Sequence, residues 1–217
     1  MALDFEQHET FTRLTLNYPP RNTLDLDAIV ELGTLFEAYP SDHPLIITGA
    51  GEAFSAGVDV KAFASYSDET RAAFFKAITR MTAALCGIAT PVVAAVNGHA
   101  LGGGLVLTLC ADYRIAVDAD YKFGLTEARA GVPFPEGPIE IIKAEVPAAL
   151  LRHLTLSSSV VRAHLLHEHC VFDELVEPDL LKARAEEVAV DLAAQPAFGA
   201  VKRQIRGELI ERLSALV

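Results

Sequence analysis

The chain has 217 residues, 51% of them hydrophobic, and its 29 acidic against 18 basic residues give a net charge of −11. A chain of this length buries a substantial core, so residues 1–217 are treated as a single domain. The acidic balance argues against a nucleic-acid binder, and no apolar run reaches the roughly 18 residues of a membrane span. We therefore expect neither nucleic acid nor membrane as a partner.

The chain carries three cysteines, Cys86, Cys110 and Cys170, and this odd number sits in apolar sequence surroundings. Their spacing fits no zinc site, so we expect reduced, buried thiols. Reduced thiols and an acidic N-terminus, where a signal peptide would be basic, predict a cytoplasmic protein.

The first half of the chain alternates predicted strands and helices, judged from apolar periodicity and from turn residues. The expected elements are a strand over 10–16, a helix from Asp25 that closes at 40–44, a strand over 45–48, a loop over 49–57, and a long helix from Asp68 to about Gly87.

The second half continues this alternation and then becomes mostly helical. The expected elements are strands over 92–96, 113–117 and 121–123, a buried helix over 105–110, helical segments near Glu140, Ala148, Arg162 and Leu180, and a last helix over 197–216. Strand–helix alternation of this kind predicts an α/β domain with helices covering the sheet.

The most distinctive stretch is Asn97–Leu105, in which three consecutive glycines lie between an apolar strand and an apolar helix. The first amides of a helix have no intrahelical partner, and glycine lets another molecule approach them closely. Such donors suit a phosphate, a carboxylate or an oxyanion formed during a reaction. A tight turn between packed elements is the structural alternative.

Three other patterns are weighed and set aside. Gly49-Ala50-Gly51 begins like a dinucleotide-binding motif, but Phe54 stands where a small residue is needed. Ser55 lies in a sequence similar to a nucleophile elbow, yet a structural serine is favoured because no strand is predicted directly before it. His164, His167 and His169 are expected to be solvated, so we expect no metal.

Two glycine-bearing segments remain, Phe54–Lys61 and Pro91–Gly104, and together they resemble the crotonase superfamily, also called the enoyl-CoA hydratase/isomerase family. The resemblance extends from about Thr10 through Phe123–Glu127 to about Val176. It implies a spiral of strand–strand–helix turns over 1–137 and a helical region, shortened here, over 138–217. It also implies acyl-CoA thioester substrates, no cofactor beyond the coenzyme A of the substrate, and a homotrimer or a dimer of trimers.

The resemblance further implies an oxyanion hole made by the backbone N–H groups of Val58 and Gly103. The segment Ala56–Lys61 would lie along coenzyme A, with Lys61 or Arg21 near phosphate, although solvated cations are an equal alternative for these two. The residues expected to contact the substrate are Ala56, Val58, Asp59, Val60, Lys61, Gly102, Gly103, Val106, Pro133 and Phe134.

The acid–base residues depart from the hydratase pattern, which has glutamates at the positions of Val106 and Glu127. A single glutamate, Glu127, can still move a proton between two carbons, so the resemblance favours an enoyl-CoA double-bond isomerase. Two alternatives stay open. Glu136 in the turn 132–138 would supply a second acid for hydration, and a catalytically silent acyl-CoA-binding protein would explain Val106.

The C-terminal segment carries two further expectations. Its basic residues Lys202, Arg203 and Arg206 either meet the phosphates of coenzyme A or form a solvated face. Leu209, Leu213 and Leu216 give the last helix an apolar side that would suit packing against a partner subunit.

Overall fold

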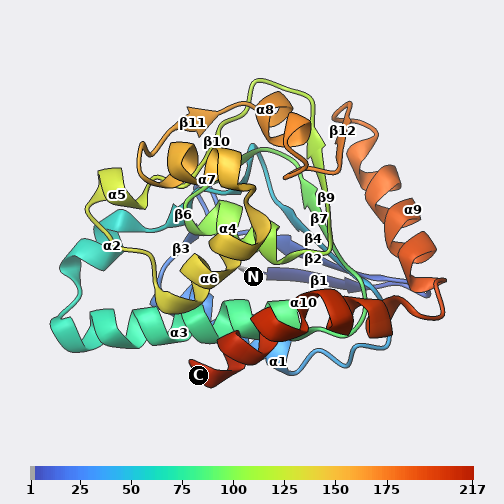
Figure 1. The fold of residues 1–217 in the computed structure, drawn as a ribbon, viewed down its shortest axis with the longest axis horizontal. Helices are drawn as coiled ribbons and strands as arrows, with labels where there is room; N and C mark the ends of the chain where they lie inside the picture. The colour runs from blue at the N-terminus through green and yellow to red at the C-terminus, as the bar shows by residue number, and fades with distance from the viewer. Residues whose placement is uncertain (1–2) are drawn as a thin grey trace.

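The computed structural model describes residues 3–217, and a six-stranded sheet forms its centre (Figure 1). Neighbours in this sheet follow the order β1-β2-β4-β7-β9-β12, and every pair is parallel except β1 and β2. The strands are β1 (Leu3–Gln7), β2 (Thr12–Leu16), β4 (Leu45–Gly49), β7 (Val92–Val96), β9 (Tyr113–Val117) and β12 (Glu174–Val176).

Shorter strands form two further sheets. The first has the order β11 (Val160–Val161), β10 (Phe123–Gly124), β8 (His99–Leu101) and β5 (Ala53–Ser55), and the second pairs β3 (Thr23–Leu24) with β6 (Gly57–Val58). A strand of the large sheet, a short strand and one or more helices repeat along the chain, as in β2-β3-α1, β4-β5-β6-α2-α3 and β7-β8-α4. The expected spiral of strand–strand–helix turns is therefore present.

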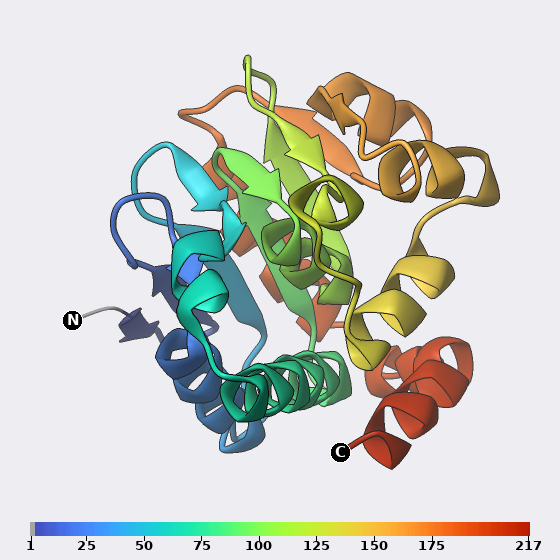
Figure 2. The same cartoon turned by 90° about the vertical axis from the view of Figure 1, so that its left-hand side faces the viewer.

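Helices lie on both faces of the large sheet (Figures 1 and 2). Helices α1, α3 and α10 lie on one side, and α9 packs on β7, β4 and β9 on the other. The helices are α1 (Leu26–Glu37), α2 (Val60–Ser65), α3 (Asp68–Gly87), α4 (Gly103–Cys110), α5 (Glu127–Ala130), α6 (Glu136–Glu145), α7 (Ala148–Thr155), α8 (Ala163–Glu168), α9 (Leu181–Ala193) and α10 (Phe198–Ala215).

Both faces of the central strands are buried, which explains why those strands are almost wholly apolar. In β7, Val92, Ala94 and Val96 face the main core with α1, α3 and α4. Val93 and Ala95 face a second cluster that α9 completes. No helix among residues 3–217 is long and apolar enough to cross a membrane.

The long, strongly periodic elements match their predicted bounds. Helix α3 spans Asp68–Gly87, and α1 starts after Asp25, whose side chain accepts a hydrogen bond from the Ala28 amide. The sequence analysis did not predict α2, α5, β1 or the strands of two or three residues, except β10, which overlaps the strand predicted over 121–123. Five of the six short strands that were not predicted lie in the short sheets. Such segments are too short to show a period. Helix α4 also begins at Gly103, two residues earlier than predicted.

The prediction of three buried thiols is wrong for Cys170. Cys86 and Cys110 are buried, whereas Cys170 is exposed. It follows α8 in a turn with φ of 57°, its amide bonded to the His167 carbonyl, and this turn carries the side chain to the surface.

Both expectations for the C-terminal helix need correction. Leu209 and Leu213 are buried in the chain's own core, where α10 packs on α3 and α6. Lys202 and Arg206 are also buried, and both form ion pairs with Asp112. They therefore do not form a basic surface that could meet coenzyme A, whereas Arg203 is exposed, as the solvated alternative expects.

Candidate active site

The two glycine-bearing loops pack directly against each other. A Cβ atom on Gly104 would lie 2.1 Å from the Ser55 carbonyl oxygen, and one on Gly57 would lie 2.4 Å from the Leu101 carbonyl oxygen. These glycines are therefore needed for close packing of one loop on the other. Gly103 differs, because the nearest atoms to its added Cβ would lie 3.8 Å away, at ordinary contact distance.

Two backbone amides meet at this contact. The Gly57 amide donates to Ser55 Oγ and the Asp59 amide to the Leu24 carbonyl, so the Val58 amide between them points away from β3. It lies 3.8 Å from the added Cβ of Gly103. Gly103 is the first residue of α4, and its amide is one of that helix's unpaired first-turn donors.

Buried Asn22 holds the first loop in place, a role that the sequence reading missed. Its side-chain amide donates to the carbonyls of Ala50 and Ala53, and its Oδ1 accepts from the Tyr18 amide. Its own carbonyl accepts a hydrogen bond from Ser55 Oγ. These four hydrogen bonds, two donated and two accepted by Asn22, hold the backbone of the loop that leads to Val58. The only available signal was a polar residue placed between a proline turn and an apolar segment.

Glu127 places a carboxylate beside the second loop. It is the first residue of α5, and a Cβ added to Gly102 would lie 3.1 Å from its Oε1. Its Oε2 is buried and has no hydrogen-bond partner among residues 3–217. Burial raises the pKa of this carboxyl from 4.5 to about 7, so it is poised to exchange a proton near neutral pH.

Gly102 connects the start of α4 to the segment that carries Glu127. Its φ of 52° is unfavourable for residues with a side chain, and its amide donates to the Gly124 carbonyl in the strand before Glu127. The segment that carries the carboxylate is thus tied to the residue that begins α4. Glu127 therefore lies against Gly102, and the next residue, Gly103, lies against Val58; we call Val58, Gly103 and Glu127 the active-site group.

The other predicted acyl-site residues lie in different settings. Val106 is buried on α4, one turn after Gly103, and offers only hydrocarbon. Glu136 is exposed and lines a cavity of about 390 Å³ with Pro133, Phe134 and Lys76, and Glu127 is not among the lining residues. Pro133 and Phe134 also line a second cavity, of about 400 Å³, on the side of Ala128 and Leu156.

The segment expected along coenzyme A is a short, well-capped turn of helix. The Asp59 side chain accepts hydrogen bonds from the amides of Lys61 and Ala62, so it caps α2. Val60 and Lys61 are exposed, and the Ala56 amide donates to the carbonyl of exposed Arg21. Arg21 and Lys61 are therefore free to meet a ligand that lies over this turn.

The alternatives set aside earlier have structural roles. Ser55 is fully buried and its hydroxyl is bonded to Asn22 and Gly57. His164 pairs with Asp118, while the Nδ1 atoms of His167 and His169 lie within hydrogen-bond distance of backbone carbonyls. Within residues 3–217, no group of three or more potential ligands is placed to hold a metal ion.

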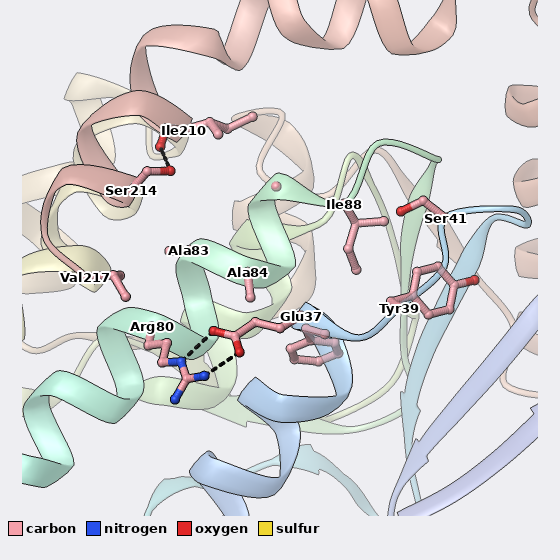
Figure 3. Close-up of a pocket in the computed structure, with 12 residues that line it drawn as sticks. Glu37, Tyr39, Ser41, Arg80, Ala83, Ala84, Ile88, Ile210, Ser214 and Val217 are labelled. Atoms are coloured by element: carbon pink, nitrogen blue, oxygen red, sulfur yellow. Dashed lines mark hydrogen bonds and ion pairs between the residues drawn. The ribbon is translucent and has the colours of Figure 1, made fainter.

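A separate cavity of about 580 Å³ lies between α1, α3 and the end of α10 (Figure 3). Its charged residues, Glu37 and Arg80, are paired with each other, and the Tyr39 hydroxyl donates to the His43 carbonyl. The cavity contains none of the residues of the two loops. It offers no unpaired acid or base for catalysis among its described lining residues.

The sequence model of one protein family, described as enoyl-CoA hydratase/isomerase, matches residues 6–215. The carnitinyl-CoA dehydratase of Citrobacter koseri is 31% identical over 215 residues, which cover 94% of this chain and 80% of that protein. The structure of Pseudomonas aeruginosa DspI has a TM-score of 0.87 and 28% identity, covering 95% of this chain and 81% of that chain.

Human mitochondrial delta3-delta2-enoyl-CoA isomerase superposes with a TM-score of 0.91, covering 99% of this chain and 87% of that chain. At 22% identity this likeness bears on the fold alone. The structural likenesses confirm the expected crotonase-like α/β fold. Together with the match over residues 6–215, they show that this chain belongs to the enoyl-CoA hydratase/isomerase family.

Proposed function

We propose that the chain catalyses double-bond migration in enoyl-CoA thioesters, from the 3,4 to the 2,3 position, with Glu127 as the single acid–base group. The observation that carries this proposal is the unpaired, buried carboxylate oxygen of Glu127, which has a pKa of about 7 and whose carboxyl group lies beside Gly102, the residue before Gly103. Val106 supplies no second carboxylate at the next turn of α4.

In the proposed reaction, the thioester oxygen accepts hydrogen bonds from the amides of Val58 and Gly103. The Glu127 carboxylate removes a proton from C2 of the 3-enoyl group, and the electron pair delocalises over C2, C4 and the thioester oxygen. Protonated Glu127 then returns the proton to C4, which leaves the 2-enoyl thioester and the original carboxylate. Each backbone donor of this kind contributes about 2.7–4 kcal/mol of transition-state stabilisation.

Dehydration, or its reverse, is the second candidate, because the relative at 31% identity is named a carnitinyl-CoA dehydratase. Loss of water from a 3-hydroxyacyl-CoA also begins with removal of the C2 proton. It then needs an acid for the departing hydroxyl, and Glu136 is the residue proposed for that step. Its exposure and its position in a cavity that does not include Glu127 favour isomerisation.

The test follows trans-3-hexenoyl-CoA and trans-2-hexenoyl-CoA separately by NMR in deuterated water. Formation of the 2-ene from the 3-ene, with no 3-hydroxyacyl product, supports the isomerase. The Glu127→Gln variant should lose this activity, and the matched Glu136→Gln variant should keep it. Formation of 3-hydroxyhexanoyl-CoA, lost in Glu136→Gln, would instead establish the hydratase. Binding without turnover of either ester would identify a silent acyl-CoA-binding protein.

A further inference from the structure

Two arginine side chains bind the C-terminal end of helix α4, the end opposite the Gly103 amide. The guanidinium of Arg206, from α10, donates to the carbonyls of Leu109 and Cys110 at 3.2 and 2.8 Å. The guanidinium of Arg114, from β9, donates to the carbonyls of Leu109 and Ala111 at 3.0 and 3.2 Å. The last carbonyls of a helix have no intrahelical partner, and these two side chains satisfy them.

Two carboxylates hold both guanidinium groups in place. Asp112 accepts from Arg206 at 3.0 Å, and Glu145, the last residue of α6, pairs with both Arg206 and Arg114. We call Arg114, Arg206, Asp112 and Glu145 the α4 clamp. The side chains of both arginines are 9% exposed. This burial removes the competition with water that makes surface ion pairs weak.

We propose that the α4 clamp, and Arg206 in particular, positions the Gly103 amide in the oxyanion hole. This inference rests on the proposed function. Helix α4 is buried over all eight residues, Gly103 to Cys110, and eight residues span about 12 Å. A short, fully packed helix moves as a rod, so a shift at its last carbonyls is transmitted to its first amide.

The clamp acts on the Gly103 amide by fixing its position, and not through the charge of the arginines. The stabilising effect of a cation on a helix end falls off within one turn, whereas the amide lies about 12 Å from the clamp. A displacement of about 1 Å at a reacting group is enough to lower a rate by about 10²-fold. Arg206 thereby links α10, which contains no residue of the active-site group, to the geometry of that group.

The test compares Arg206→Met with Lys202→Met. Lys202 lies on the same helix and is also buried, but it bonds to Asp112 and to the Thr90 carbonyl and touches no α4 carbonyl. Both variants lose a buried ion pair, and both are expected to unfold at a lower temperature. Only Arg206→Met removes hydrogen bonds to the last carbonyls of α4, those of Leu109 and Cys110. Exposed Arg203→Met serves as the surface control.

The decisive readout is carbonyl polarisation of bound 4-(dimethylamino)cinnamoyl-CoA, whose absorption moves to longer wavelength when its thioester oxygen accepts strong hydrogen bonds. In Arg206→Met we expect a smaller shift and a kcat for 3-hexenoyl-CoA lower by about 10²-fold, with an unchanged Kd for hexanoyl-CoA. Lys202→Met and Arg203→Met should keep the wild-type shift and kcat when assayed below their unfolding temperatures. Arg206→Lys, which keeps the charge with fewer donors, should lie between Arg206→Met and the wild type.

An equal loss in Arg206→Met and Lys202→Met would overturn the inference, because it would reflect general destabilisation. A wild-type shift and kcat in Arg206→Met would also overturn it, while leaving the proposed isomerase intact. The spectral shift needs binding but no turnover. A wild-type protein that shifts the probe and yet turns over no enoyl-CoA would refute the isomerase alone, and the variants would still decide the role of Arg206.

Discussion

The Glu127→Gln substitution should raise the free energy of unfolding while it lowers the catalytic rate. Raising the carboxyl pKa from 4.5 to about 7 makes the ionised group about 3 kcal/mol less favourable in the folded protein than in the unfolded chain. Glutamine has nearly the same shape and carries no charge. At about pH 8.5 the variant should therefore be more stable than the wild type by up to about 3 kcal/mol.

The sign of the pH dependence follows from proton counting. Between pH 4.5 and about 7 the folded protein binds more protons at Glu127 than the unfolded chain does, so this residue makes stability fall as pH rises. Below that window the carboxyl is neutral in both states and the penalty is absent. The stability gain in Glu127→Gln should consequently be small at low pH, grow across the window, and stay constant above it.

Urea unfolding of both proteins at several pH values measures this difference, and initial rates with 3-hexenoyl-CoA measure the chemistry. For the wild type, kcat/KM should rise with pH around an apparent pKa of about 7, because the base acts in its ionised form. The variant should lose about 10²- to 10⁴-fold in kcat. A stability gain independent of pH, or a flat pH–rate profile, would refute the assignment of a desolvated base.

Four further substitutions probe the residues around the site. Gly104→Ala should destabilise the fold by about 3 kcal/mol or prevent folding, because the new methyl would lie 2.1 Å from the Ser55 carbonyl oxygen. Gly103→Ala should fold with nearly wild-type stability but polarise a bound thioester less. Equal unfolding temperatures of the two variants would contradict the packing argument. Asn22→Ala leaves buried backbone groups unpaired, so it should lower the free energy of unfolding in urea by about 2–3 kcal/mol and weaken acyl-CoA binding. A change in unfolding free energy near zero would mean that water replaces the hydrogen bonds of Asn22. Val106→Glu places a second carboxyl one turn after Gly103 and should produce 3-hydroxyacyl-CoA from 2-hexenoyl-CoA, as detected by NMR. A folded variant that forms no such product would show that a second carboxylate at this position is not sufficient for hydration.

Long elements could be predicted from the sequence because their signals are local. Helix α3 has twenty residues of periodic pattern, and its start at Asp68 follows Ser67, whose hydroxyl accepts from the Thr70 amide. The strands β5, β6 and β8 have two or three residues each, and what defines them is pairing with distant segments. These strands bring the Val58 amide to the start of α4, so local patterns missed the elements that build the site.

The burial of charged residues on α10 could also not be predicted from local sequence. Lys202 and Arg206 were expected at the surface because lysine and arginine are rarely buried. Their partner Asp112 lies 90 and 94 residues earlier in the chain, and its side chain is 8% exposed. Helical periodicity places both cations on the helix without indicating which face is covered. By contrast, Glu127 was found because a motif from related proteins fixed its position.

The contact between Val58 and Gly103 has a consequence for mutational scanning. Two of the three groups proposed for catalysis are main-chain N–H groups, and changing the side chain at position 58 leaves its N–H in place. A library of side-chain substitutions would therefore detect Glu127 and report position 58 as tolerant. Replacing the amino acid at position 58 by the corresponding α-hydroxy acid removes the N–H itself. Backbone ester substitution is thus the direct genetic-code-expansion route to this half of the site.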